Sequence, residues 1–380
     1  MVKKLFLITF LLCSTCLIKL SAVELNYCAN PFPNSQRSII DSQKKDLLDE
    51  IRNSILFYYV KNKFNSNKSQ VFQEKLKDIL YNQSDSDFYW EISVLVNNLN
   101  NNHTFFIPKG FKNSFGIYFQ NSNKENIITK VDTDLAEKIN IGDRIISVNG
   151  QTCLSGNFNF QKNSVGDFSL MQSSDNTAYH LKLKSIFEPA IEKMQVKIEA
   201  DYIYVKIPSF SEKGITSSFF DKVNIIKDKK PMIIDLRGNS GGYLSEVMNI
   251  AKYFFDGSIG YFNGGLFGNK EIKISRDSSL FEKIGQLFLI VDGETFSAAE
   301  IFAYLLRSRV NARIIGQSTK GGLESSLTIN MPEGSVLSVA NSEYCDKNIC
   351  FYGKKIDPDF VLKIGTPIEK IISTIKEQIK

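Results

Sequence analysis

The chain has 380 residues, which at roughly 100–200 residues per domain is enough for two or three domains that each bury a core. Apolar residues make up 43% and charged residues 23%, values typical of globular chains, so wholesale disorder and a polytopic membrane protein are excluded. Lys and Arg number 46 against 41 Asp and Glu, and this formal charge of +5 is too small and too dispersed to indicate a nucleic-acid partner.

The first apolar run, residues 5–18, follows two lysines and precedes the small residues Ser21 and Ala22. A charged start, a short apolar stretch and a small residue before a polar segment are typical of a secretory signal peptide, and the run is too short for a membrane span. We therefore expect residues 1–22 to be a signal peptide cut after Ala22. The protein is then exported to the periplasm or the medium, with no integral membrane anchor.

Export would place the remaining cysteines in a compartment where disulfides form. Four of the six lie beyond residue 22, an even number bound for an oxidising compartment. We expect Cys345 to pair with the nearby Cys350, which leaves Cys28 to pair with Cys153. Only two histidines are present and the sequence has no paired Cys-x-x-Cys clusters, so no metal site is expected.

The amino-terminal region shows apolar residues at helical spacing over 40–62 and again over 69–99. Asn and Gly crowd 97–116 around His103, which places this histidine on a loop or strand edge. We expect a helical region over 23–112 that carries His103.

Short strand patterns follow, including an Asn-Gly turn at 149–150 of the kind that joins paired strands. The Ser-Phe-Gly-Ile run at 114–117 and the Gly-Asp-Arg-Ile run at 142–145 resemble a PDZ domain, which we expect over 113–190; the alternative is another small β domain with an Asn-Gly hairpin. In a PDZ domain a peptide adds a strand to an open sheet edge while loop amides bind its terminal carboxylate. The resemblance places that peptide-binding loop at three residues: Phe115, Gly116 and Ile117.

Strands and helices alternate after residue 195, a pattern that builds a mostly parallel sheet covered by helices. The expected fold class is therefore multidomain α/β. It combines the helical amino-terminal region, the PDZ-like β domain and a mostly parallel α/β catalytic domain over 191–380.

Two strand-to-helix junctions in that last domain carry chemistry. At the first, a buried strand runs into Arg-Gly-Asn-Ser-Gly-Gly at 237–242, where glycines let backbone amides face a developing oxyanion. A phosphate site is disfavoured because no P-loop Lys-Ser/Thr pair follows. At the second, a strand ends shortly before Ser297, and the small residues after it leave the hydroxyl open. Taken alone, Ser297 with Glu300 also fits a helix capping box.

Taken together, the motifs are more specific. Asp-Leu-Arg-Gly-Asn-x-Gly-Gly at 235–242, Phe-Ser-Ala-Ala-Glu-Ile at 296–301 and Ile-Ile-Gly-Gln-Ser-Thr-Lys-Gly-Gly at 314–322 resemble peptidase family S41. That family includes the carboxy-terminal processing proteases and the tricorn core protease. The resemblance extends to a closing Pro-Asp segment at 358–359, and it implies a ClpP/crotonase-like sheet with Ser297 as the nucleophile.

The resemblance also implies where the base comes from. Processing proteases use a lysine whose place, counted from Ser297, falls here on Gly322, and Lys320 is offset from it by two. The tricorn branch has Thr-x-Gly-Gly at this point, as here, and takes its base from a segment like Asn-His-Thr, which His103 and Thr104 match. A neutral imidazole accepts the hydroxyl proton near pH 7. We therefore expect His103 to be the general base; the alternative is a structural loop residue.

In tricorn-like enzymes a glutamate near the end of the domain orients the imidazole. Its place falls here near Tyr352, and Glu343 fills the role if the loop between the last two cysteines is an insertion. Three other carboxylates are alternatives: Glu324, Asp357 and Asp359. The oxyanion hole is expected from backbone amides: Ala298 together with Gly241 or Gly242.

These observations predict an exported serine endopeptidase of the S41 type that acts on peptides or proteins and needs no metal or organic cofactor. One alternative is a catalytically inactive S41-like protein that binds peptides or apolar ligands. Another is a scaffold that works mainly through its PDZ-like module.

Overall fold

The computed structural model describes most of the chain between residues 39 and 379. The described ranges are 39–59, 66–79, 84–99, 101–108, 113–114, 117–122, 125–131, 135–152, 165–184, 186–187, 193–211, 214–223, 226, 229–264, 268–276 and 280–379. The expectations for the signal peptide at 1–22 and for Cys28, Cys153, Phe115 and Gly116 lie outside these residues.

A six-stranded sheet forms the centre of the α/β part, in the order β20-β16-β15-β11-β10-β9. Its strands are β9 (Gln195–Ile198), β10 (Ile203–Lys206), β11 (Lys230–Asp235), β15 (Ile284–Val291), β16 (Arg313–Gly316) and β20 (Phe360–Val361). Neighbouring strands are parallel except for β9, which runs antiparallel to β10. The mostly parallel sheet predicted from the alternation of strands and helices is confirmed.

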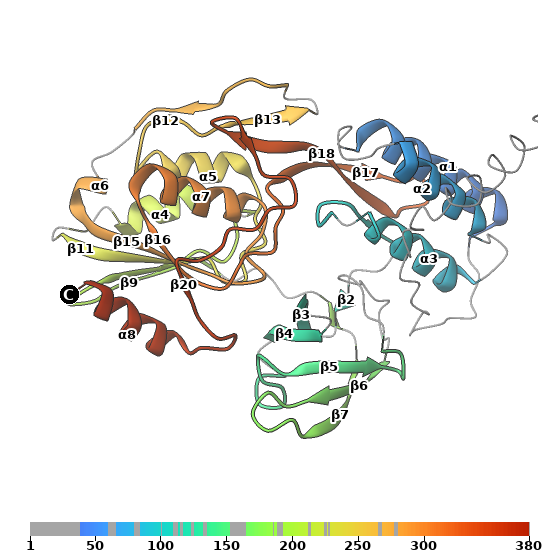
Figure 1. Cartoon of the computed structure of the whole chain (residues 1–380), viewed down its shortest axis with the longest axis horizontal. Helices are drawn as coiled ribbons and strands as arrows, with labels where there is room; N and C mark the ends of the chain where they lie inside the picture. The colour runs from blue at the N-terminus through green and yellow to red at the C-terminus, as the bar shows by residue number, and fades with distance from the viewer. Residues whose placement is uncertain are drawn as a thin grey trace, which may run out of the picture.

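Helices cover both faces of this sheet (Figure 1). One face packs against α4 (Ile215–Val223), α5 (Leu244–Ala251) and α7 (Ala298–Val310), and the other against α8 (Ile368–Ile379); the short α6 (Leu280–Lys283) leads into β15. Side chains of a strand alternate between faces. In β11, Met232 and Ile234 accordingly join the core under α4, α5 and α7, whereas Ile233 packs with Ile371 of α8.

A second, antiparallel sheet is built around the long strand β18 (Val336–Asp346). Its partners are β1 (Phe105–Ile107), β13 (Tyr261–Gly264), β17 (Glu324–Asn330) and β19 (Ile349–Cys350). A separate two-stranded pair joins β12 (Gly257–Ser258) to β14 (Lys273–Ile274). Strand β18 therefore connects segments from the beginning, middle and end of the chain.

The amino-terminal helices are α1 (Asp41–Tyr58), α2 (Ser66–Asp78) and α3 (Asp85–Asn97). The pattern over 69–99 is thus two helices, because Ser84 caps α3 by accepting the Asp87 N–H at 3.1 Å. The helices share one apolar core with Leu337 and Val339 of β18. Figure 1 shows them at one end of β17 and β18. The sequence prediction of a helical region to residue 112 needs this correction: its end includes β1, which joins the sheet around β18.

A five-stranded antiparallel sheet lies at the lower edge of Figure 1, in the order β3-β4-β5-β6-β7. Its strands are β3 (Ile117–Ser122), β4 (Glu125–Val131), β5 (Arg144–Val148), β6 (Val165–Met171) and β7 (Ala178–Lys184); β2 (Asn113–Ser114) pairs with β8 (Ile186–Phe187). Asn149 and Gly150 have φ of 49° and 78°, as a tight turn requires. Ile117 begins β3 and packs against the apolar core of this sheet.

None of the helices in the described ranges combines the length and apolar character that a bilayer crossing needs.

Candidate active site

Ser297 lies on the turn between β15 and α7, with φ of 56° and ψ of −123°. A non-glycine residue at positive φ is uncommon and marks a backbone held by its surroundings. Ala298 is the first residue of α7, so its N–H has no acceptor within the helix. The turn therefore presents a hydroxyl beside a backbone donor that can bind an anion.

The glycine-rich segment 237–242 runs directly against this turn. The Phe296 N–H donates to the Asn239 carbonyl at 2.9 Å, and the Gly238 N–H donates to the Asp292 carboxylate at 3.0 Å. The structure thus brings the two predicted strand-to-helix junctions together.

Gly241 and Gly242 lie against the site in different ways. A Cβ on Gly241 would lie 2.9 Å from the Cβ of Ser297 and 3.0 Å from the Ala298 nitrogen, so only glycine fits there. The Gly241 N–H, however, donates to the Asn239 side chain at 2.8 Å. Of the two glycine amides considered from the sequence, Gly242 is therefore the better partner for Ala298.

The segment that carries His103 is fixed on β18. The Ser338 hydroxyl donates to the His103 carbonyl at 2.8 Å, and the Ala340 N–H donates to the Thr104 hydroxyl at 3.0 Å. The His103 N–H donates to the Asn101 side chain at 2.9 Å. Antiparallel pairing of β1 with β18 thus determines where this histidine leaves the sheet.

The His103 ring is buried beside the residue that precedes Ser297. It stacks on Phe296 with ring centroids 4.5 Å apart and planes at 29°, and its Nε2 lies 3.0 Å from the Gly322 carbonyl oxygen. Burial lowers the pKa of His103 to about 4, although the Gly322 carbonyl acts in the opposite direction. The imidazole is therefore neutral at pH 7 and keeps one nitrogen lone pair for accepting a proton.

Glu300, which the sequence analysis considered only as part of a capping box, contacts both the serine turn and the segment 319–322. Its buried carboxylate accepts the N–H groups of Ser297 at 2.8 Å, Gly321 at 2.9 Å and Gly322 at 2.8 Å, and the Thr319 hydroxyl at 2.5 Å. Burial raises the pKa of Glu300 to about 7, although these donors lower it. The capping-box pattern accounts for the Ser297 bond alone, because the other three partners come from a segment about twenty residues further along the chain.

Glu343 lies on β18 and is buried, with Glu324 of β17 directly opposite it. Its Oε1 accepts the Asn263 side-chain N–H at 3.0 Å. Among the described residues, the polar partner of the His103 ring is the Gly322 carbonyl rather than a carboxylate. The structure thus brings His103 next to the serine turn, but it places no glutamate on the imidazole.

The alternative carboxylates bind elsewhere. Glu324 accepts the Gly353 N–H at 2.5 Å, and Asp357 accepts the Ser318 hydroxyl at 2.6 Å. Asp359 accepts the Ile314 N–H at 2.7 Å and so attaches the closing Pro-Asp segment to β16. Lys320 Nζ lies 3.6 Å from Glu294.

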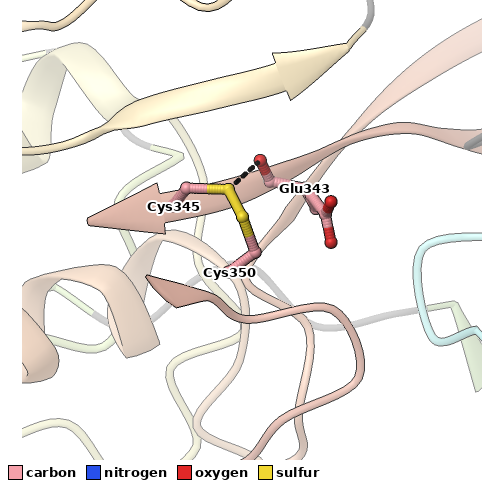
Figure 2. A group of neighbouring side chains, drawn as sticks. All are labelled: Glu343, Cys345 and Cys350. Carbon is pink, nitrogen blue, oxygen red and sulfur yellow. Dashed lines mark hydrogen bonds between the residues drawn. A yellow bond between two sulfur atoms is a disulfide. The ribbon is translucent and has the colours of Figure 1, made fainter. Parts of the chain in front are cut away.

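Cys345 and Cys350 are joined by a disulfide, next to Glu343 on β18 (Figure 2). A carboxylate oxygen of Glu343 and the sulfur atoms of Cys345 and Cys350 all lie within 4.8 Å of one another. Both sulfurs are bonded to each other, so neither provides the thiolate that a metal site needs. The group does not fit a metal centre in this state.

Comparisons with known proteins found similar sequences and folds. Residues 201–362 match peptidase family S41. A probable CtpA-like serine protease of Staphylococcus haemolyticus is 28% identical over 227 residues, which cover 54% of this chain and 44% of that protein. The carboxy-terminal processing protease CtpA of Bacillus subtilis is 26% identical over 285 residues, covering 65% of this chain and 58% of that protein.

A solved structure of mature CPAF complexed with lactacystin superimposes with a TM-score of 0.63 at 12% identity, covering 90% of this chain and 99% of that one. At this identity the likeness concerns the fold alone. The chain spans about half the length of the curated relatives it matches.

Proposed function

Since the chain belongs to peptidase family S41 through residues 201–362, we propose that it is a serine endopeptidase in which Ser297 is the nucleophile and His103 the general base. The main observation behind the proposal is that two segments far apart in the sequence, one with His103 and one with Ser297, lie in contact. The imidazole of His103 stacks on Phe296, next to a serine held at positive φ. A buried neutral imidazole beside a partly exposed serine is the arrangement that nucleophilic catalysis needs.

The proposed reaction proceeds in two halves. The Ser297 oxygen attacks the carbonyl carbon of the scissile peptide bond while its proton passes to His103. The oxyanion of the tetrahedral intermediate accepts hydrogen bonds from the N–H groups of Ala298 and Gly242. When the C–N bond breaks, His103 returns the proton to the leaving amine, and water then hydrolyses the acyl-enzyme by the same steps.

Glu343 is the proposed third member, which orients the imidazole. Two observations support it: the residue is buried, and it lies on β18, the strand on which the His103 segment docks through Ser338 and Ala340. Glu324, its cross-strand neighbour, is the matched comparison because it is also buried.

We further propose that the protein is exported after cleavage at Ala22 and that the sheet β3 to β7 is a PDZ-like module binding extended or carboxy-terminal peptide segments. An edge strand of an antiparallel sheet can accept such a segment as an additional strand. The substrates are then peptides or proteins outside the cytoplasm.

The test uses a serine-directed fluorophosphonate probe and a fluorogenic peptide. We expect the folded wild-type protein to be labelled, and labelling to vanish in Ser297→Ala and His103→Ala. Glu343→Gln should lower kcat about 10²- to 10⁴-fold, the range expected for loss of an orienting carboxylate, whereas Glu324→Gln should change it much less. A folded protein that neither labels nor hydrolyses peptides would contradict the proposal and support the catalytically inactive binding protein.

A further inference from the structure

The side chain of Phe296 has no role in the proposed reaction, yet it lies between the serine turn and the imidazole of His103. The backbone of this residue is fixed, since its N–H donates to Asn239 and its carbonyl accepts the Ala299 N–H at 3.1 Å. The ring stacks on His103 at 4.5 Å between centroids. Phe296 therefore connects the serine turn rigidly to the imidazole.

The same ring also fills the space above Gly322. A Cβ at position 322 would lie 1.9 Å from Cε2 of Phe296, a distance that no side chain tolerates. Space alone thus requires glycine here. Counted from Ser297, position 322 is also where the sequence resemblance places the lysine of the processing proteases. The Phe296 ring and a side chain at 322 therefore exclude each other.

We propose that Phe296 is a positioning residue for His103: its ring is an aromatic platform that holds the imidazole over the serine turn in the volume that a lysine side chain at 322 would need. This inference rests on the proposed function. The stacking distance and angle match the offset arrangement that aromatic rings favour. With Phe296 on one side and the Gly322 carbonyl on Nε2, the ring is restrained in both tilt and rotation.

Three further charged groups lie near this platform. Lys320 Nζ is 5.7 Å from the Phe296 ring centroid and 3.6 Å from Glu294. Glu300 lies behind Gly322, whose N–H it accepts at 2.8 Å. Removing the Phe296 ring would expose the imidazole to water and to these charges, which changes its titration as well as its position.

The experiment measures ring position without relying on activity. The chain has two histidines, so its imidazole NMR signals are few, and His103→Ala identifies the signal of His103. In Phe296→Ala we expect the His103 midpoint to rise by at least one pH unit from its wild-type value near 4, since burial is what lowers it. Phe296→Tyr should restore the wild-type midpoint, because it keeps the aromatic face.

Kinetics provide the second readout. Phe296→Ala should lower kcat about 10²-fold with little change in KM, since a misplaced base affects the chemical step more than substrate binding. Phe296→Tyr should again be close to wild type. The matched control is Phe220→Leu, which removes a ring stacked on Tyr253 at 5.2 Å elsewhere in the α/β part and should leave both the titration and kcat unchanged.

The outcomes separate the two proposals. An active wild type whose Phe296→Ala variant keeps the wild-type midpoint and kcat overturns this inference and leaves the proposed function intact. A wild type that neither labels nor cleaves overturns the proposed function and, with it, the catalytic meaning of the platform. A shifted midpoint together with a reduced kcat supports both.

Discussion

A single buried carboxylate, Glu300, connects the proposed nucleophile to the segment that contacts the proposed base. Its Oε2 accepts the N–H groups of both Ser297 and Gly322, and its Oε1 accepts the N–H of Gly321. The Gly322 carbonyl in turn contacts Nε2 of His103. The relative position of serine and histidine therefore depends on one side chain that contacts neither reacting atom, and we regard it as a positioning residue.

The first prediction concerns Glu300→Gln. The amide nitrogen of glutamine cannot accept the backbone N–H groups that the carboxylate oxygen accepts, so we expect a loss of about 1.5–3 kcal/mol in the free energy of unfolding. Activity should fall mainly through kcat. Chemical denaturation and peptidase assays measure the two effects, and Glu282→Gln, at an exposed position, is the control. Unchanged kcat in a folded Glu300→Gln variant would show that Glu300 is a helix cap alone.

A second prediction follows from the raised pKa of Glu300, which is about 7. Protonation removes acceptor capacity, so activity should decrease as the pH falls through about 7. The lowered pKa of His103, about 4, keeps the base neutral over that range, so His103 does not cause this limb. Glu300→Gln should therefore move the acid limb of the kcat profile to lower pH. If the midpoint of the acid limb stays near pH 7 in this variant, the limb reports the titration of a group other than Glu300.

Titration of Glu300 and titration of His103 change the free energy of unfolding in opposite directions as the pH rises. The pKa of Glu300 is raised from 4.5 on folding, so the folded state holds this proton more tightly and stability decreases as the pH rises between 4.5 and about 7. The pKa of His103 is lowered from 6.5, so the unfolded state binds more protons and stability increases as the pH rises between about 4 and 6.5. The two contributions offset each other where these windows overlap.

At the level of elements, the parallel sheet and the serine turn were predictable, but the antiparallel sheet around β18 was not. A run of buried apolar residues such as β11 predicts a strand from its local sequence alone. The motifs that follow β11 and β15 predict the serine turn and the glycine-rich segment beside it. Strand β18 pairs with segments far away in the sequence, β1 and β13, and pairing of this kind leaves no local pattern. For the same reason the partners of Glu300 and Glu343 were not visible from the sequence.

The hairpin of β18 and β19 is the element for which the third prediction is made. Lys347 and Asn348 have φ of 48° and 66°, a type I′ turn that matches the twist of the strands, and the disulfide joins the directly opposed Cys345 and Cys350. Just after this hairpin, the hydroxyl of Tyr352 forms a hydrogen bond of 2.7 Å with the hydroxyl of Tyr59 in α1's C-terminal flank. The disulfide thus stabilises a hairpin that also anchors the helical region.

Replacing both cysteines, in Cys345→Ala/Cys350→Ala, should lower the free energy of unfolding by about 2 kcal/mol, the chain-entropy value for so small a loop. Dithiothreitol should lower the melting temperature of the wild type. Any effect of dithiothreitol that persists in the double variant measures the pairing expected between Cys28 and Cys153. A double variant as stable as the wild type, with and without reductant, would contradict the prediction.

On the scale of the whole molecule, the proposed site is shared between two apolar cores. Ser297 directly precedes Ala298 and Ala299 of the α/β core, whereas His103 follows α3 of the helical core, which packs on Leu337 and Val339 of β18. In the helical core, the Lys44 side chain is fully buried and lies 2.8 Å from Asp85, the first residue of α3. This ion pair holds α1 to the beginning of the helix that leads to His103.

The last prediction uses this ion pair to separate the two cores. Lys44→Ala leaves a buried carboxylate without its cation and should cost about 3–5 kcal/mol, whereas Lys45→Ala, at the exposed neighbouring position, should cost little. Since His103 depends on the helical core and Ser297 does not, fluorophosphonate labelling of Lys44→Ala should disappear at a lower temperature than the α/β part unfolds, as followed by circular dichroism. Labelling that persists in Lys44→Ala up to the unfolding of the α/β part would mean that the serine is activated without the helical core.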